Sequence, residues 1–163
     1  MSQRQRIVLA IGLPGAGKST WFHKEGITPL SSDHLRFLLA DDEDEQGFQA
    51  EIFHALRFLL EVRIGMGRPV SYVDATNLVA EQRQPFLEQA RELDVAIEAI
   101  FFDVPLDVCL QRNSGRPRRV PEDVMRAMAQ ALEPPTILEG FSKVTVIGAD
   151  GSTLSQPEAK PQG

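Results

Sequence analysis

A glycine-rich segment near the N-terminus, GLPGAGKST, carries residue types that suit the binding of phosphate groups. It fits the pattern G-x-x-x-x-G-K-[S/T] and lies between an apolar run and a stretch that can form a helix, as this motif requires. Glycines let the backbone bend so that successive N–H groups and the N-terminus of the next helix face an anion. A lysine supplies a compact charge for the β- and γ-phosphates, and a serine hydroxyl is a hard oxygen ligand for Mg²⁺. The segment therefore predicts a site for ATP and Mg²⁺ at Gly12, Pro14, Gly15, Ala16, Gly17, Lys18, Ser19 and Thr20, with Ser19 as the metal ligand.

Two charged residues in the segment SSDHLR could act on a hydroxyl group that accepts a phosphoryl group. Asp33 follows a predicted strand, and residues beyond the carboxyl ends of parallel strands line the ligand crevice. Arg36 comes three residues later and shares a face with Asp33 if a helix begins here. In one interpretation Asp33 is a base and Arg36 clamps the acceptor. In the other, which composition alone favours, Asp33 is a helix N-cap and Arg36 faces solvent.

The segment DATN occupies the same place after the next predicted strand. Thr76 and Asn77 immediately precede a helix-patterned stretch, so they can cap that helix. A capped turn at the crevice also presents Asp74 and Asn77 to a ligand. The two interpretations are compatible, and we expect Asp74, Thr76 and Asn77 on the substrate side of the site.

Residues 111–119, QRNSGRPRR, hold four arginines and no acid. Arg112 and Arg116 flank a flexible Asn-Ser-Gly. A mobile basic lid over residues 111–121 would close over phosphates and neutralise charge in the transition state. The alternative is an exposed basic loop without a role in catalysis.

These residues need strands and helices to bring them together. Short apolar runs alternate with stretches of helical periodicity, which predicts a three-layer α/β fold with a central parallel sheet of about five strands. Pro85 requires that its helix start near it or kink there. The predicted strands cover residues 6–11, 28–31, 70–73, 95–102 and 143–147, and the main predicted helices cover residues 48–64, 80–93, 105–112 and 121–132.

Length and composition limit the class of protein. A chain of 163 residues with 42% hydrophobic content is expected to form one domain, over residues 1–147. Residues 148–163 lack apolar periodicity, which predicts a loose tail without function. No apolar run is long enough for a membrane helix, and the N-terminus does not read as a signal peptide, so we expect a cytoplasmic protein.

The number and spacing of the cysteine and histidine residues give no indication of redox or metal chemistry. The single cysteine, Cys109, lies in an apolar stretch, which is typical of a core residue, and it excludes an internal disulfide. His23, His34 and His54 have no metal-ligand spacing, so we expect ordinary surface or boundary residues.

The net charge of −6 argues mildly against a nucleic-acid partner. The distribution of charge weakens that argument, because residues 41–45, DDEDE, carry five of the acids. The rest of the chain is therefore close to neutral, and the arginine segment is strongly basic.

Four segments together resemble a known family: GLPGAGKST-W, SSDHLR, VDATNL followed by Arg83, and FFDVPLDVCLQRNSGRPRRVPEDVMRAM. They are similar to the P-loop polynucleotide 5′-hydroxyl kinases, the kinase domains of phage and bacterial end-healing enzymes, within the wider zeta-toxin-like P-loop kinases. The resemblance runs from Ile7 to Met128. Its most specific part is FDVP followed by RNS and then VP, which a general P-loop NTPase fold does not require.

The resemblance implies a role for each matching residue. Asp33 would be the general base for a 5′-hydroxyl, and Arg36 would contact the acceptor phosphate. Lys18 would hold ATP together with the glycine loop, and Arg116 would reach its phosphates from the lid, supported by Arg112. Asp74, Thr76 and Asn77 match a family segment beside the active site.

Three functions follow as hypotheses. The first is an ATP- and Mg²⁺-dependent kinase acting on the 5′-hydroxyl end of DNA or RNA, with separate phosphatase or ligase proteins as partners. The second is a kinase of the same architecture for a small-molecule hydroxyl such as a nucleoside, sugar or antibiotic. The acidic segment, residues 41–45, motivates the second, because it would repel a polyanion. The third is a nucleotide-binding switch, which needs no acceptor base.

Overall fold

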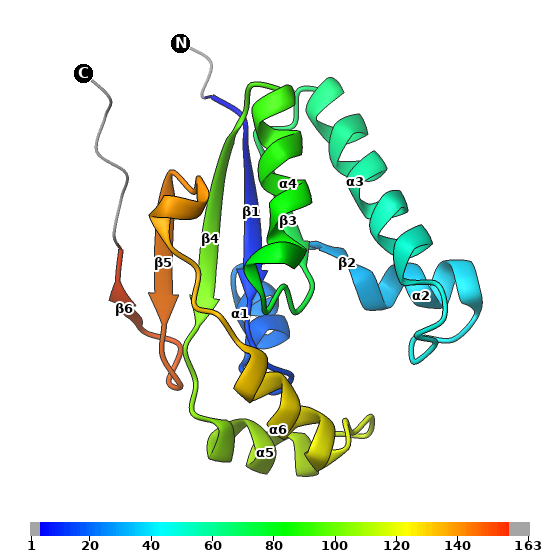
Figure 1. Ribbon diagram of the computed structural model, residues 1–163, viewed down its shortest axis with the longest axis vertical. Helices are drawn as coiled ribbons and strands as arrows, with labels where there is room; N and C mark the ends of the chain where they lie inside the picture. Colours follow the sequence, from blue (N-terminus) through cyan, green and yellow to red (C-terminus); the bar gives the residue numbers. More distant parts are fainter. Residues whose placement is uncertain (1–3, 157–163) are drawn as a thin grey trace.

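The computed structural model describes residues 4–156, in which a six-stranded sheet of order β2-β3-β1-β4-β5-β6 separates two layers of helices (Figure 1). The first five strands pair in parallel, and β6 runs antiparallel to β5. The three-layer α/β architecture predicted from the sequence is confirmed. The strands are β1 (Arg6–Ile11), β2 (Leu30–Ser31), β3 (Val70–Asp74), β4 (Ala96–Phe102), β5 (Lys143–Ile147) and β6 (Thr153–Ser155). The helices are α1 (Lys18–Lys24), α2 (Ser32–Ala40), α3 (Gln49–Gly65), α4 (Ala80–Glu92), α5 (Leu106–Ser114), α6 (Glu122–Ala131) and the short 3₁₀ helix η1 (Ile137–Glu139).

The central strand β1 is apolar throughout because both of its faces are covered. Ile7, Leu9 and Ile11 belong to the core under α3 and α4. Val8 and Ala10 alternate with them and face the core under α1, α5 and α6. This pattern is typical of a strand buried on both sides in a parallel sheet.

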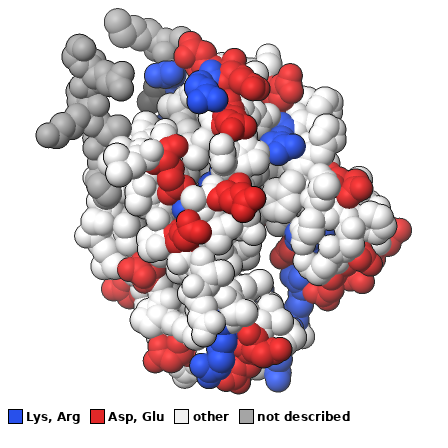
Figure 2. All heavy atoms as spheres, in the orientation of Figure 1, with Lys and Arg blue, Asp and Glu red and all other residues white. Residues whose placement is uncertain are grey.

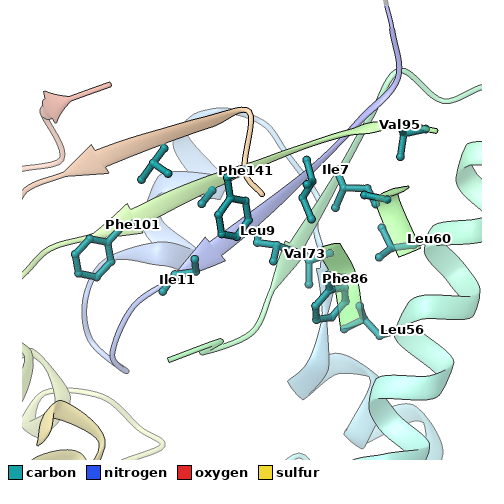
Figure 3. Close-up of a cluster of buried hydrophobic side chains, with 14 of the residues drawn as sticks. Ile7, Leu9, Ile11, Leu56, Leu60, Val73, Phe86, Val95, Phe101 and Phe141 are labelled. Atoms are coloured by element: carbon teal, nitrogen blue, oxygen red, sulfur yellow. The ribbon is translucent and has the colours of Figure 1, made fainter. Parts of the chain in front are cut away.

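Figure 3 shows the first of these two cores, in which Leu56 and Leu60 of α3 and Phe86 of α4 lie against Val73 and Ile7. In the second core Cys109 of α5 is completely buried, which confirms its prediction as a core residue. These contacts fix the helices that flank the carboxyl ends of the strands.

Pro85 lies inside α4 rather than at its start, so of the two expected alternatives, a start or a kink, the start near Pro85 is wrong. The helix begins five residues earlier at Ala80. Pro85 has no N–H to donate to the carbonyl of Glu81, which removes one hydrogen bond near the N-terminal end of the helix.

The prediction of a loose tail over residues 148–163 is corrected for its first part. Residues 153–155 form β6, which pairs with β5 through a tight turn. In that turn Gly148 N–H donates to the Ser152 carbonyl at 3.0 Å, and Asp150 Oδ1 accepts from Ser152 N–H at 2.9 Å. Glycine, aspartate and serine are turn residues as well as residues of loose segments, so composition could not separate the two. The last part of the predicted tail, residues 157–163, lies outside the described residues.

None of the helices between residues 4 and 156 is long and apolar enough to cross a membrane.

Candidate active site

A cleft of about 1760 Å³ opens at the carboxyl ends of the parallel strands. It is bounded by the glycine-rich loop, the segments after β2 and β3, the region between α5 and α6, and the turn between β5 and β6. Figure 2 shows a hollow on this side of the molecule, between the lobe of α2 and α3 and the α5–α6 side. Parallel strands all deliver their following loops to this edge, which is why residues far apart in the sequence meet here.

Two glycines of the glycine-rich loop have backbone angles that residues other than glycine rarely adopt. Gly15 has φ +80° and Gly17 has φ +95°. A Cβ at position 15 would lie 2.7 Å from the carbonyl oxygen of Cys109, so α5 packs directly against the loop backbone. Gly17 is also the N-cap of α1. The loop thus forms the concave backbone surface that an anion needs.

Lys18 lies folded across this loop. Its Nζ donates to the carbonyl of Gly12 at 2.6 Å and to that of Leu13 at 3.1 Å. Burial lowers the pKa of the Lys18 ammonium, and the carboxylates of Asp74 and Asp33 oppose that shift. Burial also raises the pKa of the Asp74 carboxyl, against the attraction of Lys18. The ammonium of Lys18 and the carboxyl of Asp74 therefore interact in a desolvated region beside the loop, and the half-exposed carboxylate of Asp33 acts on both.

The residues of the loop fit ATP and Mg²⁺. The cradle at Gly15 has no room for a side chain, the ammonium of Lys18 is bound only by carbonyl oxygens in its described hydrogen bonds, and Ser19 and Thr20 are exposed at the start of α1. Backbone N–H groups, one lysine and a hydroxyl are the groups that bind a triphosphate and its metal.

The structure contradicts the interpretation in which Asp33 is a cap and Arg36 faces solvent. Ser31 is the N-cap of α2, because its Oγ accepts from His34 N–H at 3.3 Å. Asp33 therefore lies in the first turn, and the interpretation of Asp33 as the cap is wrong. Arg36 is only 7% exposed, so it does not face solvent either. Its Nη1 donates to Asp33 Oδ1 at 2.8 Å, and its Nη2 donates to Gln49 Oε1 at 2.6 Å.

The second oxygen of Asp33 is bound by a residue that the sequence analysis did not single out. Arg118 Nη1 donates to Asp33 Oδ2 at 2.9 Å. The same guanidinium contacts Asp44 Oδ1 at 2.5 Å through Nε and the Glu43 carbonyl at 3.2 Å through Nη2. In the sequence Arg118 is one of several neighbouring arginines, and nothing local distinguishes it.

The segment after β3 contributes through its backbone and through two side chains. Asp74 and Thr76 line the cleft, and the Thr76 carbonyl accepts from Gly12 N–H at 3.3 Å. Asn77 is 1% exposed and lies beneath the cleft surface, with φ +47°. The expected capping role of Thr76 and Asn77 is wrong, because the N-cap of α4 is Val79.

Arg83 holds this segment in place from below. It is fully buried, and it donates to both carboxylate oxygens of Glu139 at 2.8 and 3.0 Å. Its Nη1 also donates to the carbonyls of Asn77 at 2.9 Å and Glu133 at 3.0 Å. Arg83 therefore fixes the backbone that presents Asp74 and Thr76.

The arginine segment predicted as a lid begins inside α5 and becomes irregular at Gly115. Arg112 bridges two walls of the cleft, donating to the Gly15 carbonyl at 3.3 Å and to the Ala149 carbonyl at 2.5 Å. Arg116 also lines the cleft. The buried side chain of Asn113, a second residue not singled out from the sequence, closes the loop by bonding Val120 N–H at 3.0 Å and the Val120 carbonyl at 2.7 Å.

Known proteins resemble most of the chain. A family described as "AAA domain" matches residues 7–135. The human L-seryl-tRNA(Sec) kinase is 29% identical over 94 residues, which cover 57% of this chain and 27% of that protein. The Arabidopsis thaliana transcription factor bHLH140 is 27% identical over 155 residues, which cover 90% of this chain and 16% of that protein. The chain therefore spans less than a third of the length of these two relatives.

Solved structures share the fold at low identity. A chain of the Pnkp1/Rnl/Hen1 RNA repair complex superposes with a TM-score of 0.69 at 19% identity, covering 81% of this chain and 45% of that one. A gluconokinase from Sinorhizobium meliloti superposes with a TM-score of 0.61 at 16% identity, covering 90% of this chain and 84% of that one. The likeness confirms the predicted α/β P-loop fold, with a mostly parallel six-stranded sheet.

Proposed function

The chain belongs to the AAA domain family, whose match spans residues 7–135, and from this premise we propose that it is a kinase that transfers the γ-phosphate of ATP to the 5′-hydroxyl end of a polynucleotide. The observation that carries the proposal is the pair formed by Asp33 and Arg36. A half-exposed carboxylate lies at the cleft, held at 2.8 Å by a guanidinium that is almost completely buried. A base and a fixed cation in one cleft with a phosphate-binding loop are the parts that phosphoryl transfer requires.

The donor side of the cleft is the glycine-rich loop. Its backbone N–H groups, Lys18 and Ser19 would hold ATP and Mg²⁺, with Arg116 reaching the phosphates from the lid. When bound, ATP would supply the phosphoryl group, and Mg²⁺ together with the cationic side chains would neutralise its charge. Arg112 would keep the loop and the β5–β6 turn at a fixed separation, because it already bonds the carbonyls of Gly15 and Ala149.

The acceptor side is built around Asp33. Its Oδ2 would accept the proton of the acceptor hydroxyl while Arg36 holds Oδ1 and fixes the plane of the carboxylate. Arg36 cannot turn freely, because Gln49 holds its other terminal nitrogen. Asp74 and Thr76 would line the path of the acceptor, with their backbone fixed by Arg83.

Two observations favour a nucleic-acid acceptor. A seryl-tRNA kinase is among the relatives, and a protein of an RNA repair complex is among the structural neighbours. In addition, Arg118 pairs with Glu43 and Asp44, which offsets part of their negative charge.

The second candidate is a kinase for a small-molecule hydroxyl. The net charge of −6 favours it, together with the carboxylate of Asp44 in the wall of the cleft. A strongly negative protein attracts polyanions weakly.

One assay tests the proposal. Labelled γ-phosphate transfer from ATP and Mg²⁺ is measured on a short oligonucleotide with a 5′-hydroxyl, beside the same oligonucleotide with a 5′-phosphate and beside the Lys18→Ala variant. Product from the hydroxyl end alone, and lost in the variant, supports a polynucleotide kinase. For a nucleic-acid acceptor the KM rises steeply with salt, because phosphate contacts release counterions. Turnover of a nucleoside or sugar with a salt-insensitive KM supports the second candidate instead.

A further inference from the structure

Arg118 connects the two sides of the cleft. It lies on the loop between α5 and α6, whose ends Asn113 joins by its two bonds to Val120. Its partners, Glu43 and Asp44, lie across the cleft on the segment between α2 and α3. Figure 2 shows acidic side chains gathered over the lobe of α2 and α3, with basic atoms in the hollow beside it.

In this arrangement both oxygens of the proposed base are bound by cations. Arg36 donates to Oδ1 of Asp33 at 2.8 Å, and Arg118 donates to Oδ2 at 2.9 Å. The guanidinium of Arg118 therefore occupies Oδ2, the oxygen that the proposed function assigns to the acceptor hydroxyl. Because Arg36 covers the other oxygen, an acceptor hydroxyl gains free access to Asp33 only when one of the two arginines moves aside.

The contact that gives way is the one to Arg118. The side chain of Arg36 is 8% exposed and is also held by Gln49, so it is fixed in the protein interior. The side chain of Arg118 is 29% exposed and belongs to an irregular loop. A partly exposed ion pair is easier to break than one whose cation is buried and held on its other side, so Arg118 leaves more easily.

Local hydrogen bonds hold the acidic segment, residues 41–45, in a turn that faces Arg118. The side chain of Asp42 accepts from Asp44 N–H at 2.9 Å, and Glu45 Oε1 accepts from Gly47 N–H at 2.7 Å. These bonds form a local turn that presents Asp44 Oδ1 to Arg118 Nε at 2.5 Å. Asp41 ends α2 with φ +59°, and Arg118 has no described ion pair with it.

We propose that Arg118 is a gate over the catalytic base, held shut by Glu43 and Asp44, and that acceptor binding moves it off Oδ2 of Asp33. The proposal rests on the proposed kinase function, since it assigns Asp33 as the base. While the gate is shut, Asp33 does not activate water, so ATP hydrolysis is slow until an acceptor enters. An anionic group on the acceptor can take over the guanidinium as it leaves Asp33, which favours acceptors with a phosphate near the hydroxyl.

Two double variants with the same charge change test the gate. Glu43→Gln with Asp44→Asn removes the two carboxylates of the acidic segment that contact Arg118, and Asp41→Asn with Asp42→Asn removes two carboxylates of the same segment with no described ion pair to Arg118. Asparagine tolerates the left-handed conformation at position 41 and keeps an oxygen at position 42 for the local turn. Backbone hydrogen exchange of residues 113–121 is measured without substrates, and acceptor-free ATP hydrolysis and the acceptor KM are measured beside it.

We expect about two- to five-fold faster exchange of the lid in the first variant, the range set by the loss of exposed ion pairs. We expect a rise of similar size in acceptor-free ATP hydrolysis and a matching fall in the acceptor KM, with kcat unchanged. The second variant should match the wild type in all three.

Equal hydrogen exchange of residues 113–121 in the two variants would overturn the claim that Glu43 and Asp44 hold the gate shut. Faster exchange in the first variant with unchanged ATP hydrolysis would overturn the gate, since Arg118 would then not shield Asp33. Failure of the kinase proposal can be distinguished from failure of the gate. If the protein is not a kinase of this kind, the wild type phosphorylates no acceptor, but hydrogen exchange still shows whether Glu43 and Asp44 hold the lid.

Discussion

A Cβ at position 15 would lie 2.7 Å from the carbonyl oxygen of Cys109, so the phosphate-binding loop and helix α5 share a contact that only glycine permits. Because α5 leads directly into the lid, this contact sets the position of Arg112 and Arg116 relative to the loop. The glycine-rich loop and helix α5 therefore hold each other in position, and a change at Gly15 affects both.

Gly15→Ala tests that contact, with Gly26→Ala as the matched control. Both glycines have positive φ, +80° and +67°, but a Cβ at Gly26 meets nothing within 4 Å. The control should lose about 1–2 kcal/mol of unfolding free energy from backbone strain alone. Gly15→Ala should lose more and should weaken ATP binding as well. Denaturant unfolding and ATP titration measure the two effects, and equal losses in stability would contradict the proposed contact.

Asp33→Asn keeps the shape of the proposed base and removes its ability to take a proton. We expect phosphoryl transfer to fall about 10²- to 10⁴-fold, the usual contribution of a general base, while ATP affinity stays close to that of the wild type. Asp94→Asn is the control, because Asp94 is exposed at the opposite end of the sheet and tolerates asparagine at φ +51°. Wild-type kcat in Asp33→Asn would exclude Asp33 as the base.

The partly buried carboxyl of Asp74 predicts a dependence of stability on pH. Burial raises its pKa above the ordinary value of 3.8, Lys18 opposes that shift, and Asp33 adds to it. The native state therefore holds a proton that the unfolded state releases, so the stabilising contribution present below pH 3.8 is lost as the pH rises through the native pKa. Asp74→Asn should be more stable than the wild type at pH 7, and the difference should shrink as the pH falls toward 3.8. Urea unfolding at several pH values measures this difference, and a difference that grows toward acid would contradict it.

Substitution of Arg83 tests whether this side chain holds the segment after β3 in place. Removing one partner of a buried ion pair leaves the other without compensation, so Arg83→Ala should lose about 3–5 kcal/mol of unfolding free energy. Arg91→Ala, exposed on the same helix, should change it by at most about 0.5 kcal/mol.

A double-mutant cycle with Glu139→Ala extends that experiment. Because Arg83 and Glu139 bind each other through two hydrogen bonds, the double variant should lose clearly less than the sum of the single variants. Additive losses would show that the two side chains act independently.

The sheet could be predicted because apolar runs and their alternation with helices depend on burial, which sequence patterns record directly. The five parallel strands and the helices α3 to α6 were predicted in order from such runs. Strand β6 was missed, since its turn and a loose tail have the same composition. Caps were less predictable, because SSD offers three candidates and only the backbone decides that Ser31 is the cap.

Some residues of the candidate site could be predicted from the sequence, and others could not. Lys18, Asp33 and Asp74 were placed at one edge by the topology of parallel strands alone, and the structure brings them together there. Arg118 could not be distinguished from its neighbours, because its partners are 74 and 85 residues away in sequence. Asn113 lies in the arginine segment, but its role depends on where the lid returns to α6.

The pairing of β1 has a consequence for synthesis on the ribosome. This strand bonds to β3 and β4, with Arg6 opposite Val70 and Ala96, and to no strand close to it in sequence. At about 5–20 residues per second, the apolar run of β1 lacks at least one of its two partner strands for about 5–20 seconds, until β4 has been made. During that time its apolar residues can pair with other chains, so we expect the yield of folded protein to depend on holdase chaperones and on growth temperature.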